Sequence, residues 1–351
     1  SCEPDDAPWI TGMMDTPAGP VPKVSTTLEW TDRLGSWRAR WGIGRMRYWV
    51  KPRLYAVGAP TGDSPVFVSA NYKMSFDRLR SALAGIHGWI LVLDTKGINV
   101  WCAAGKGTFG TDELVRQINA ANLSKVVSHK KLVVPQLGAP GVAAHEVRRQ
   151  SGFRVVYGPV LAEDIPAFLN AHLRATPEMR RVEFPLRDRL AVVPVELVMS
   201  AKHVFMVMTA LLLLAGFGPD GYSWAGVAGS GVCSAVLFAG AFVVGAILTP
   251  ALLPWVPGRA LAIKGTWIGV ALLVAIAGAA WALQATPNCW LTVTAWCLLI
   301  PVTVSFSAMD FAGSTTYTSL SGVRREMRIA VPIQVAGAVL GAILWFAGRF
   351  V

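Results

Sequence analysis

Short apolar runs alternate with longer amphipathic stretches through residues 53–175. This alternation is typical of βαβ units, and it predicts an α/β, Rossmann-like domain with a parallel sheet covered by helices. The expected strands are residues 65–69, 89–94, 131–135 and 154–157, and the expected helices are 75–84, 111–123, 142–150 and 163–173. Ser75 and Thr111 are of the residue types that cap helix amino termini, so each is expected to cap the helix that it opens.

Beyond residue 198 the polar positions almost disappear. Five apolar runs, each about 19 to 25 residues long and so able to cross a bilayer, cover residues 198–216, 224–248, 262–283, 290–308 and 329–347. We therefore expect an all-α transmembrane bundle of five helices over residues 198–351. No ionisable residue is central in a run, which favours an anchoring bundle over a proton-coupled transporter. The pairs Gly265/Gly269 and Gly337/Gly341 predict close helix packing.

Charge divides along the same line. Residues 200–351 contain seven Lys or Arg and three Asp or Glu, whereas residues 1–199 contain 25 and 18. The basic residues on the side of the N-terminal domain include those of a linker at residues 176–197: Arg180, Arg181, Arg187, Arg189, Arg259, Lys264, Arg324, Arg325 and Arg328. The opposite side has Asp220 and only one basic residue, Arg349. The positive-inside rule then predicts a multi-pass protein of the cytoplasmic membrane with its N-terminal domain in the cytoplasm.

The first 52 residues have a different composition. Residues 1–25 are rich in Pro, Gly and Asp and are expected to be irregular. Residues 30–49 interleave Trp and Tyr with Arg, and we expect an edge hairpin packed against the domain. The same composition suits a membrane interface or an acidic partner. With a membrane domain on the same chain, nucleic acid is not expected to be a partner.

Cys102 is the candidate reactive residue. It follows the expected strand at residues 89–94, at the rim of the sheet where ligands of open α/β folds bind. Helix amides and Lys106 should make its thiol ionise more easily than a free cysteine; the alternative is a small buried hydrophobe. Val100 and Gly107 stand where a phosphate-binding loop needs Gly and Ser or Thr, which excludes that motif. The loops at residues 95–107, 135–141 and 157–160 should meet at this rim and could receive a large flat ligand.

Residues 99–106, Asn-Val-Trp-Cys-Ala-Ala-Gly-Lys, resemble the cap-helix signature of the HgcA family, the corrinoid proteins of microbial mercury methylation. The resemblance implies a corrinoid-dependent methyltransferase that passes a methyl group from a Cys-ligated methyl-cobalt corrinoid to Hg(II), forming methylmercury. Cys102 would be the catalytic residue and the axial ligand of the cobalt. The signature residues implied to bind the corrinoid are Asn99, Val100, Trp101, Cys102, Ala103, Ala104, Gly105 and Lys106. Candidate contacts from the rim loops are Thr95, Gln136, Gly138, Tyr157 and Gly158.

The family resemblance also implies partners. These are an HgcB-like ferredoxin with two [4Fe–4S] clusters, a methylated folate donor or its methyltransferase, and Hg(II) as substrate. The chain has no cysteine cluster for an iron–sulfur centre of its own. It also lacks the D-x-H-x-x-G motif with which other corrinoid proteins supply histidine, so sulfur would be the side-chain ligand. A thiolate is a soft, electron-rich donor, which suits methyl transfer to an electrophilic metal ion.

Two other functions stay open. Residues 71–77, Asn-Tyr-Lys-Met-Ser-Phe-Asp, resemble a segment of the large subunit of the corrinoid iron–sulfur protein, so the chain could be a methyl carrier of the acetyl-CoA pathway type. The other alternative is a membrane-anchored thiol or metal sensor that uses Cys102 as its switch.

Overall fold

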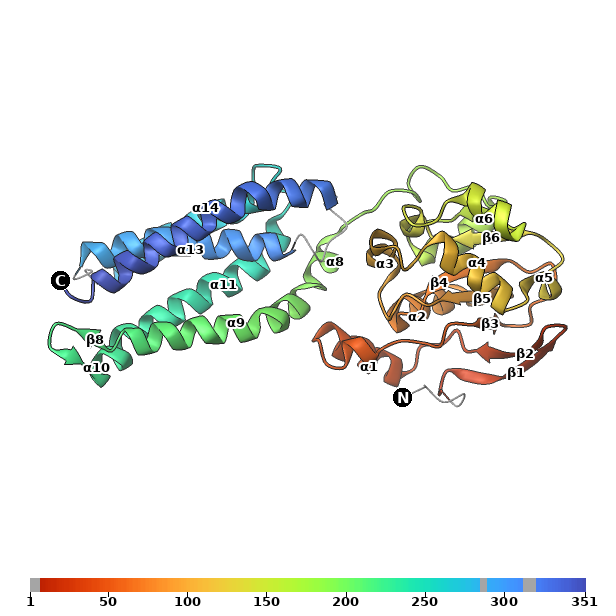
Figure 1. Cartoon of the computed structure of the whole chain (residues 1–351), viewed down its shortest axis with the longest axis horizontal. Helices are drawn as coiled ribbons and strands as arrows, with labels where there is room; N and C mark the ends of the chain where they lie inside the picture. Colours follow the sequence, from red (N-terminus) through yellow and green to blue (C-terminus); the bar gives the residue numbers. More distant parts are fainter. Residues whose placement is uncertain (1–6, 285–288, 312–319) are drawn as a thin grey trace. The chain divides into compact units, whose positions relative to one another are not determined.

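The computed structural model describes residues 7–284, 289–311 and 320–351. The chain forms two compact units, one within residues 1–39 and 43–183 and the other within residues 40–42 and 184–351 (Figure 1). The first six residues of the segment expected to be irregular lie outside the described ranges.

A seven-stranded sheet forms the centre of the first unit. Its strands lie in the order β1-β2-β3-β5-β4-β6-β7, and they are β1 (Ile10–Thr16), β2 (Gly19–Val24), β3 (Leu54–Val57), β4 (Val66–Ala70), β5 (Gly88–Leu93), β6 (Lys131–Val134) and β7 (Arg154–Tyr157). Strands β4 to β7 pair in parallel, as the sequence predicts. Strand β3 runs antiparallel to β5, and β1 runs antiparallel to β2. The α/β class is therefore confirmed, but the sheet is mixed rather than parallel throughout.

The helices of the first unit follow the predicted alternation. They are α1 (Trp30–Arg40), α2 (Lys73–Ala82), α3 (Val100–Lys106), α4 (Thr111–Ala120), α5 (Leu123–Val126), α6 (Ala144–Ser151) and α7 (Ile165–Asn170), with short 3-10 turns η1 (Arg45–Arg47), η2 (Gln136–Gly138) and η3 (Ala162–Asp164). Neither Ser75 nor Thr111 is the N-cap residue that the sequence predicts. Tyr72 precedes α2 and Gly110 precedes α4, and the Thr111 hydroxyl instead accepts a hydrogen bond from the Ala143 amide at 2.9 Å.

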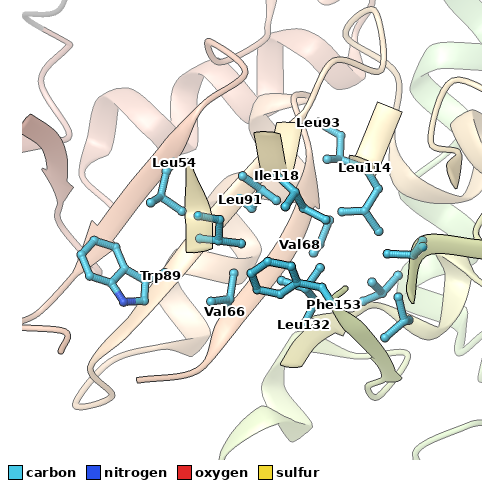
Figure 2. Close-up of a cluster of buried hydrophobic side chains, with 14 of the residues drawn as sticks. Leu54, Val66, Val68, Trp89, Leu91, Leu93, Leu114, Ile118, Leu132 and Phe153 are labelled. Carbon is cyan, nitrogen blue, oxygen red and sulfur yellow. The ribbon is translucent and has the colours of Figure 1, made fainter. Parts of the chain in front are cut away.

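Alternate residues of the strands enter two hydrophobic clusters on opposite faces of the sheet, as the two-residue period of a strand requires. Figure 2 shows the first cluster, in which Leu91 and Val68 of the strands lie near Leu114 and Ile118 of α4. The second cluster combines neighbouring strand positions such as Phe67 and Ile90 with α2 and α7. Each fully buried side chain of this size stabilises the fold by about 1.5–3 kcal/mol. The layered core fixes the strand ends, where the candidate site lies.

The N-terminal expectations are wrong. Residues 10–24 form the β1–β2 hairpin, which joins the sheet through parallel pairing of β2 with β3. Residues 30–40, expected as part of an edge hairpin, form helix α1. Both elements are ordered by tertiary contacts that their Gly, Pro and Arg content does not reveal. Val21 and Val24 enter the two clusters, and Asp32 of α1 pairs with two cations of α2.

The second unit contains the apolar helices. Its elements are α8 (Leu186–Leu190), α9 (Val193–Leu214), β8 (Phe217–Gly218), β9 (Gly221–Tyr222), α10 (Trp224–Gly226), the π-helical turn η4 (Val227–Gly231), α11 (Val232–Leu252), α12 (Leu261–Ala282), α13 (Trp290–Asp310) and α14 (Leu320–Ala347). Within the described ranges, five helical segments are long and apolar enough to cross a membrane. This number agrees with the sequence prediction and is compatible with a multi-pass membrane protein.

Glycines bring the helices of this unit close together. A Cβ atom at Gly265 would lie 2.7 Å from Ser305 Cα, and one at Gly269 would lie 2.6 Å from Pro301 Cα. Gly337 and Gly341 of α14 likewise face side chains of α13 at 2.8 Å. The packing predicted from the two glycine pairs is confirmed.

Two basic side chains bind the end of α11. The Arg189 guanidinium donates to the carbonyls of Pro250 (2.9 Å) and Ala251 (2.8 Å). The Lys264 ammonium donates to the carbonyls of Leu253 (2.8 Å) and Val256. The last carbonyls of a helix have no partner within it and carry partial negative charge. Arg189 therefore caps α11 and Lys264 binds carbonyls just after it, although the sequence predicts both cations among the charges that orient the transmembrane bundle.

Candidate functional site

The candidate site lies at one edge of the first unit's sheet. Because β4 to β7 are parallel, their carboxyl ends share this edge, and the loops that follow them meet there. Helix α3, which carries Cys102, begins seven residues after the end of β5 (Figure 1). The 3-10 turn η2, which follows β6, packs against α3. The predicted convergence of the cysteine loop and the loop at residues 135–141 is thus confirmed.

Asn71 holds the loop that leads from β5 to α3. Its side-chain oxygen accepts hydrogen bonds from the Thr95 amide (3.1 Å), the Thr95 hydroxyl (2.8 Å) and the Gly97 amide (2.9 Å). Gly97 has a φ of 71°, which glycine adopts at little cost. In the sequence, residues 71–77 resemble a segment of the corrinoid iron–sulfur protein, but this resemblance gives Asn71 no role. Its role depends on two strands being neighbours, which no local pattern shows.

Helix α3 has well-defined ends. The Asn99 side chain accepts a hydrogen bond from the Cys102 amide at 2.9 Å, which is the geometry of an N-cap. At the other end Gly107 has a φ of 82°, and its amide donates to the Ala104 carbonyl. These two residues set the length of the helix and hold the backbone of Cys102.

The two faces of α3 have different surroundings. Ala103 and Ala104 are buried in the first hydrophobic cluster, whereas Gly105 and Lys106 are exposed. With about 100° of rotation per residue, Cys102 lies on the same side as Gly105 and Lys106. Its side chain is half-buried. The small residues of the signature thus attach the helix to the domain, and the thiol is left on the outer side.

A second loop approaches α3 closely. A Cβ atom at Gly141 would lie 2.1 Å from the Phe109 carbonyl oxygen and 3.1 Å from Ala104 Cα. Only glycine fits at this position, and only a small residue fits opposite it at position 104. The loop after β6 is thereby packed directly against the carboxyl end of α3.

Burial raises the pKa of the Cys102 thiol above its ordinary value of 9.0, although the Asn99 amide and the positive charges of Lys106 and Arg45 act in the opposite direction. The expectation of an easily ionised thiol is therefore wrong for the protein without a ligand. Lys106 lies where expected, but the desolvation of a half-buried sulfur outweighs it. A metal that binds the thiolate would displace a proton.

The rim-loop residues have distinct surroundings. Thr95 is fully buried, and its hydroxyl lies 2.6 Å from the Ile98 carbonyl. The Tyr157 hydroxyl donates to the Val142 carbonyl at 2.6 Å. Gly138 and Gly158 are buried with no room for a Cβ atom. These four residues shape the rim from within.

Gln136 differs from them because its side-chain oxygen is buried and has no hydrogen-bond partner. Among the signature residues, Val100 packs against the first cluster and Trp101 is half-buried. Of the predicted contacts, Gly105 and Lys106 are exposed, Cys102 is half-buried on the outer side of α3, and Gln136 has an unpaired oxygen.

A buried cluster of charges lies at α2, the helix that follows Asn71. Lys73 Nζ lies 2.8 Å from Asp32 Oδ1 and 2.6 Å from Asp77 Oδ1, and Arg80 lies 2.7 Å from both carboxylates. Burial disfavours ionisation of Asp32, but the two cations outweigh it and lower its pKa. This cluster ties α1 to α2, which directly follows Asn71. Three of its members fall in residues 71–80 at helical spacing, and Asp32 could be found only from the fold.

Comparison with known proteins gives the type of this domain. Residues 45–169 match the family described as CO dehydrogenase/acetyl-CoA synthase delta subunit. The chain is 32% identical over 122 residues to the acetyl-CoA decarbonylase/synthase complex subunit gamma of Archaeoglobus fulgidus, covering 34% of this chain and 26% of the relative. It is 27% identical over 126 residues to the corrinoid/iron-sulfur protein large subunit of Moorella thermoacetica, covering 35% and 28%. The chain thus spans about a quarter of the length of these relatives, and the matches support a domain of the corrinoid/iron–sulfur protein type at residues 45–169.

Proposed function

We propose that the first unit holds a corrinoid and acts as a methyl carrier, and that the Cys102 sulfur would be the side-chain ligand of the cobalt. The observation that carries the proposal is the position of Cys102. It lies on the outer side of a capped helix, at the carboxyl edge of the sheet, in a domain of the corrinoid/iron–sulfur protein type. A bound corrinoid would supply a cobalt-held methyl group to an acceptor.

The donor groups of the site fit such a ligand. A thiolate is a suitable donor for a transition metal, and Asn99 holds the backbone of Cys102 in place. Gln136 offers a buried acceptor without a partner, and amide groups at the edge of a corrin ring are donors that would satisfy it. Lys106 and Arg45 lie close enough to stabilise negative charge on the sulfur once its proton has left.

We propose Hg(II) as the acceptor. The octapeptide at residues 99–106 supports this, together with five apolar helices that lie outside the family match at residues 45–169. A sulfur ligand increases the electron density available to the methyl group, which an electrophilic metal ion requires. Reduction of the cofactor would then depend on a ferredoxin-like partner, and its remethylation on a methylated folate donor or the corresponding methyltransferase.

A second acceptor follows from the relatives themselves. They belong to acetyl-CoA decarbonylase/synthase complexes and to a corrinoid/iron–sulfur protein. A methyl carrier of that type would deliver the group to an acetyl-CoA synthase centre rather than to a free metal ion. The two candidates share the cofactor and differ in the acceptor.

The first experiment is the ultraviolet–visible spectrum of the full chain, purified and reconstituted with cobalamin. Cys102→Ala should alter the spectrum, and Cys297→Ala, the same change at a free cysteine of α13, should leave it unchanged. A wild-type protein that binds no cobalamin would refute the corrinoid proposal and favour the thiol sensor. Equal spectra for wild type and Cys102→Ala would refute sulfur ligation.

The acceptor is tested separately with a labelled methyl group. The loaded protein is offered Hg(II) or an acetyl-CoA synthase under the same reducing conditions. Labelled methylmercury that is lost in Cys102→Ala supports the mercury proposal. Transfer to the synthase alone supports the second candidate.

A further inference from the structure

Helix α1 exposes a stripe of large apolar side chains. Trp30 is 74% exposed, Leu34 is 41% exposed and Trp37 is 55% exposed. Residues four and three positions apart lie on one side of a helix, within about 60° of one another. The three side chains therefore form a single apolar surface rather than scattered exposed residues.

The other side of α1 is fixed to the domain. Asp32 and Ala39 are buried there, and Asp32 forms ion pairs with Lys73 and Arg80 of α2. Gly35 lies so close to the Tyr48 ring that a Cβ atom would be 2.8 Å from it. These contacts fix the opposite side of α1 to the domain, so the stripe faces outward.

Positive charge borders the stripe on both sides. At about 100° per residue, Arg33 lies on one side of it and Arg38 on the other, and both are exposed. Residues 30–49 contain five arginines and one acidic residue, Asp32, whose charge is neutralised within the domain. Six residues after the end of α1, Met46 adds a further apolar side chain that is 76% exposed.

The chain itself indicates what this surface meets. The first unit ends at Glu183, and the first segment apolar enough to cross a membrane begins at Leu186. Two residues lie between them, so the three steps from residue 183 to residue 186 span at most about 11 Å. Any membrane that the second unit crosses therefore lies near the first unit. Trp and Arg are the residues typical of the headgroup region.

We propose that α1 is a membrane-docking helix that inserts Trp30, Leu34 and Trp37 into the headgroup region of an anionic bilayer. Arg33 and Arg38 bind lipid phosphates beside the inserted side chains. The proposal does not depend on the corrinoid, because none of these residues belongs to the cysteine site.

The test uses the full chain in nanodiscs that contain phosphatidylcholine alone or with one quarter phosphatidylglycerol. The photoreactive residue p-benzoylphenylalanine replaces Trp30, Leu34 or Trp37, and in a control it replaces Gln150, an exposed residue of α6. After irradiation, mass spectrometry identifies lipid adducts and protein adducts. Retained binding of an antibody to the folded first unit checks the fold of each variant.

We expect lipid adducts at all three stripe positions, several-fold more with phosphatidylglycerol, and none at position 150. Replacing both Arg33 and Arg38 with Glu should remove the increase due to phosphatidylglycerol. Adducts only to protein at the stripe, whether to the same chain or to a second copy, would overturn the proposal. Equal lipid labelling at position 150 would overturn it as well.

Discussion

The buried charge cluster allows a prediction with a built-in control. Arg80 is fully buried, and it donates to Asp77, Asp32 and the carbonyls of Ser25 and Thr27. In Arg80→Leu only Lys73 would neutralise two buried carboxylates, and two carbonyls would lose their donor. Breaking a buried ion pair by removing one partner costs about 3–5 kcal/mol.

Arg116 provides the matched comparison. Its Nε lies 2.7 Å from a Glu113 carboxylate oxygen three residues earlier, the same spacing and distance as Arg80 Nε to Asp77. The Arg116 side chain, however, is 60% exposed, and an exposed pair contributes roughly 0–1 kcal/mol. Arg116→Leu should therefore destabilise the first unit by no more than this amount.

Hydrogen exchange of the full chain measures both variants. The slowest amides of β4 and β5 exchange through opening of the whole unit. In Arg80→Leu they should exchange at least roughly a hundredfold faster, because each 1.4 kcal/mol is a factor of ten. In Arg116→Leu they should change less than roughly tenfold. Similar rates in the two variants would refute the argument that burial gives the cluster its energetic weight.

Three further predictions concern the cysteine site. Asn99→Ala should destabilise α3 by about 1 kcal/mol, so the Cys102 and Ala103 amides should exchange roughly fivefold faster. Asn99→Asp should preserve the cap. Unchanged hydrogen exchange in Asn99→Ala would contradict the capping role of Asn99. Because burial raises the pKa of Cys102 above 9.0, the thiolate fraction is small at neutral pH. The rate at which Cys102 is alkylated should therefore rise about tenfold per pH unit and still be rising at pH 9.0. A plateau in this rate below about pH 8 would contradict the raised pKa. Gly141→Ala should displace α3 and cost about 1–3 kcal/mol, seen as faster hydrogen exchange in residues 100–106. Gly278→Ala, with open space at its Cβ position, should leave this exchange unchanged. Unchanged exchange in Gly141→Ala would show that the loop can move away from α3.

Much of the fold could be predicted because its signals are local. Strands β4 to β7 are short apolar runs between turn residues, and the observed bounds differ from the predicted ones by a residue or so. The helices that follow them have clear amphipathic periods. Strand β3 is equally buried and as short as β6 and β7, but it is not among the expected strands. Its antiparallel direction depends on where the chain returns, which local periodicity does not encode.

Helix α1 shows a different limit of sequence reasoning. Its apolar residues follow a helical spacing, yet they face solvent while its single carboxylate faces the core. The usual rule that the apolar side is the buried side does not apply here. The stabilising partners, Lys73 and Arg80, are more than forty residues away along the chain.

The candidate site also has features that could be predicted from the sequence and features that could not. The position of Cys102 at the strand edge follows from the order of strand and helix, so it could be predicted. The raised pKa of its thiol could not, because it depends on how deeply the packed loops cover the sulfur. Asn71 and the unpaired oxygen of Gln136 also become evident only when separate loops are brought together.

The cations bound near the end of α11 have a consequence for how the apolar helices of the second unit would insert into a membrane. Arg189 and Lys264 come from segments on either side of α11, and both bind near its carboxyl end. Once these four hydrogen bonds form, both cations are withdrawn from solvent. Inverting the helices at that stage would require breaking the bonds and moving two buried cations through hydrocarbon. We therefore expect the fold to lock the orientation that the helices take in a membrane, and substituting either cation should yield chains of mixed topology as well as a weaker bundle.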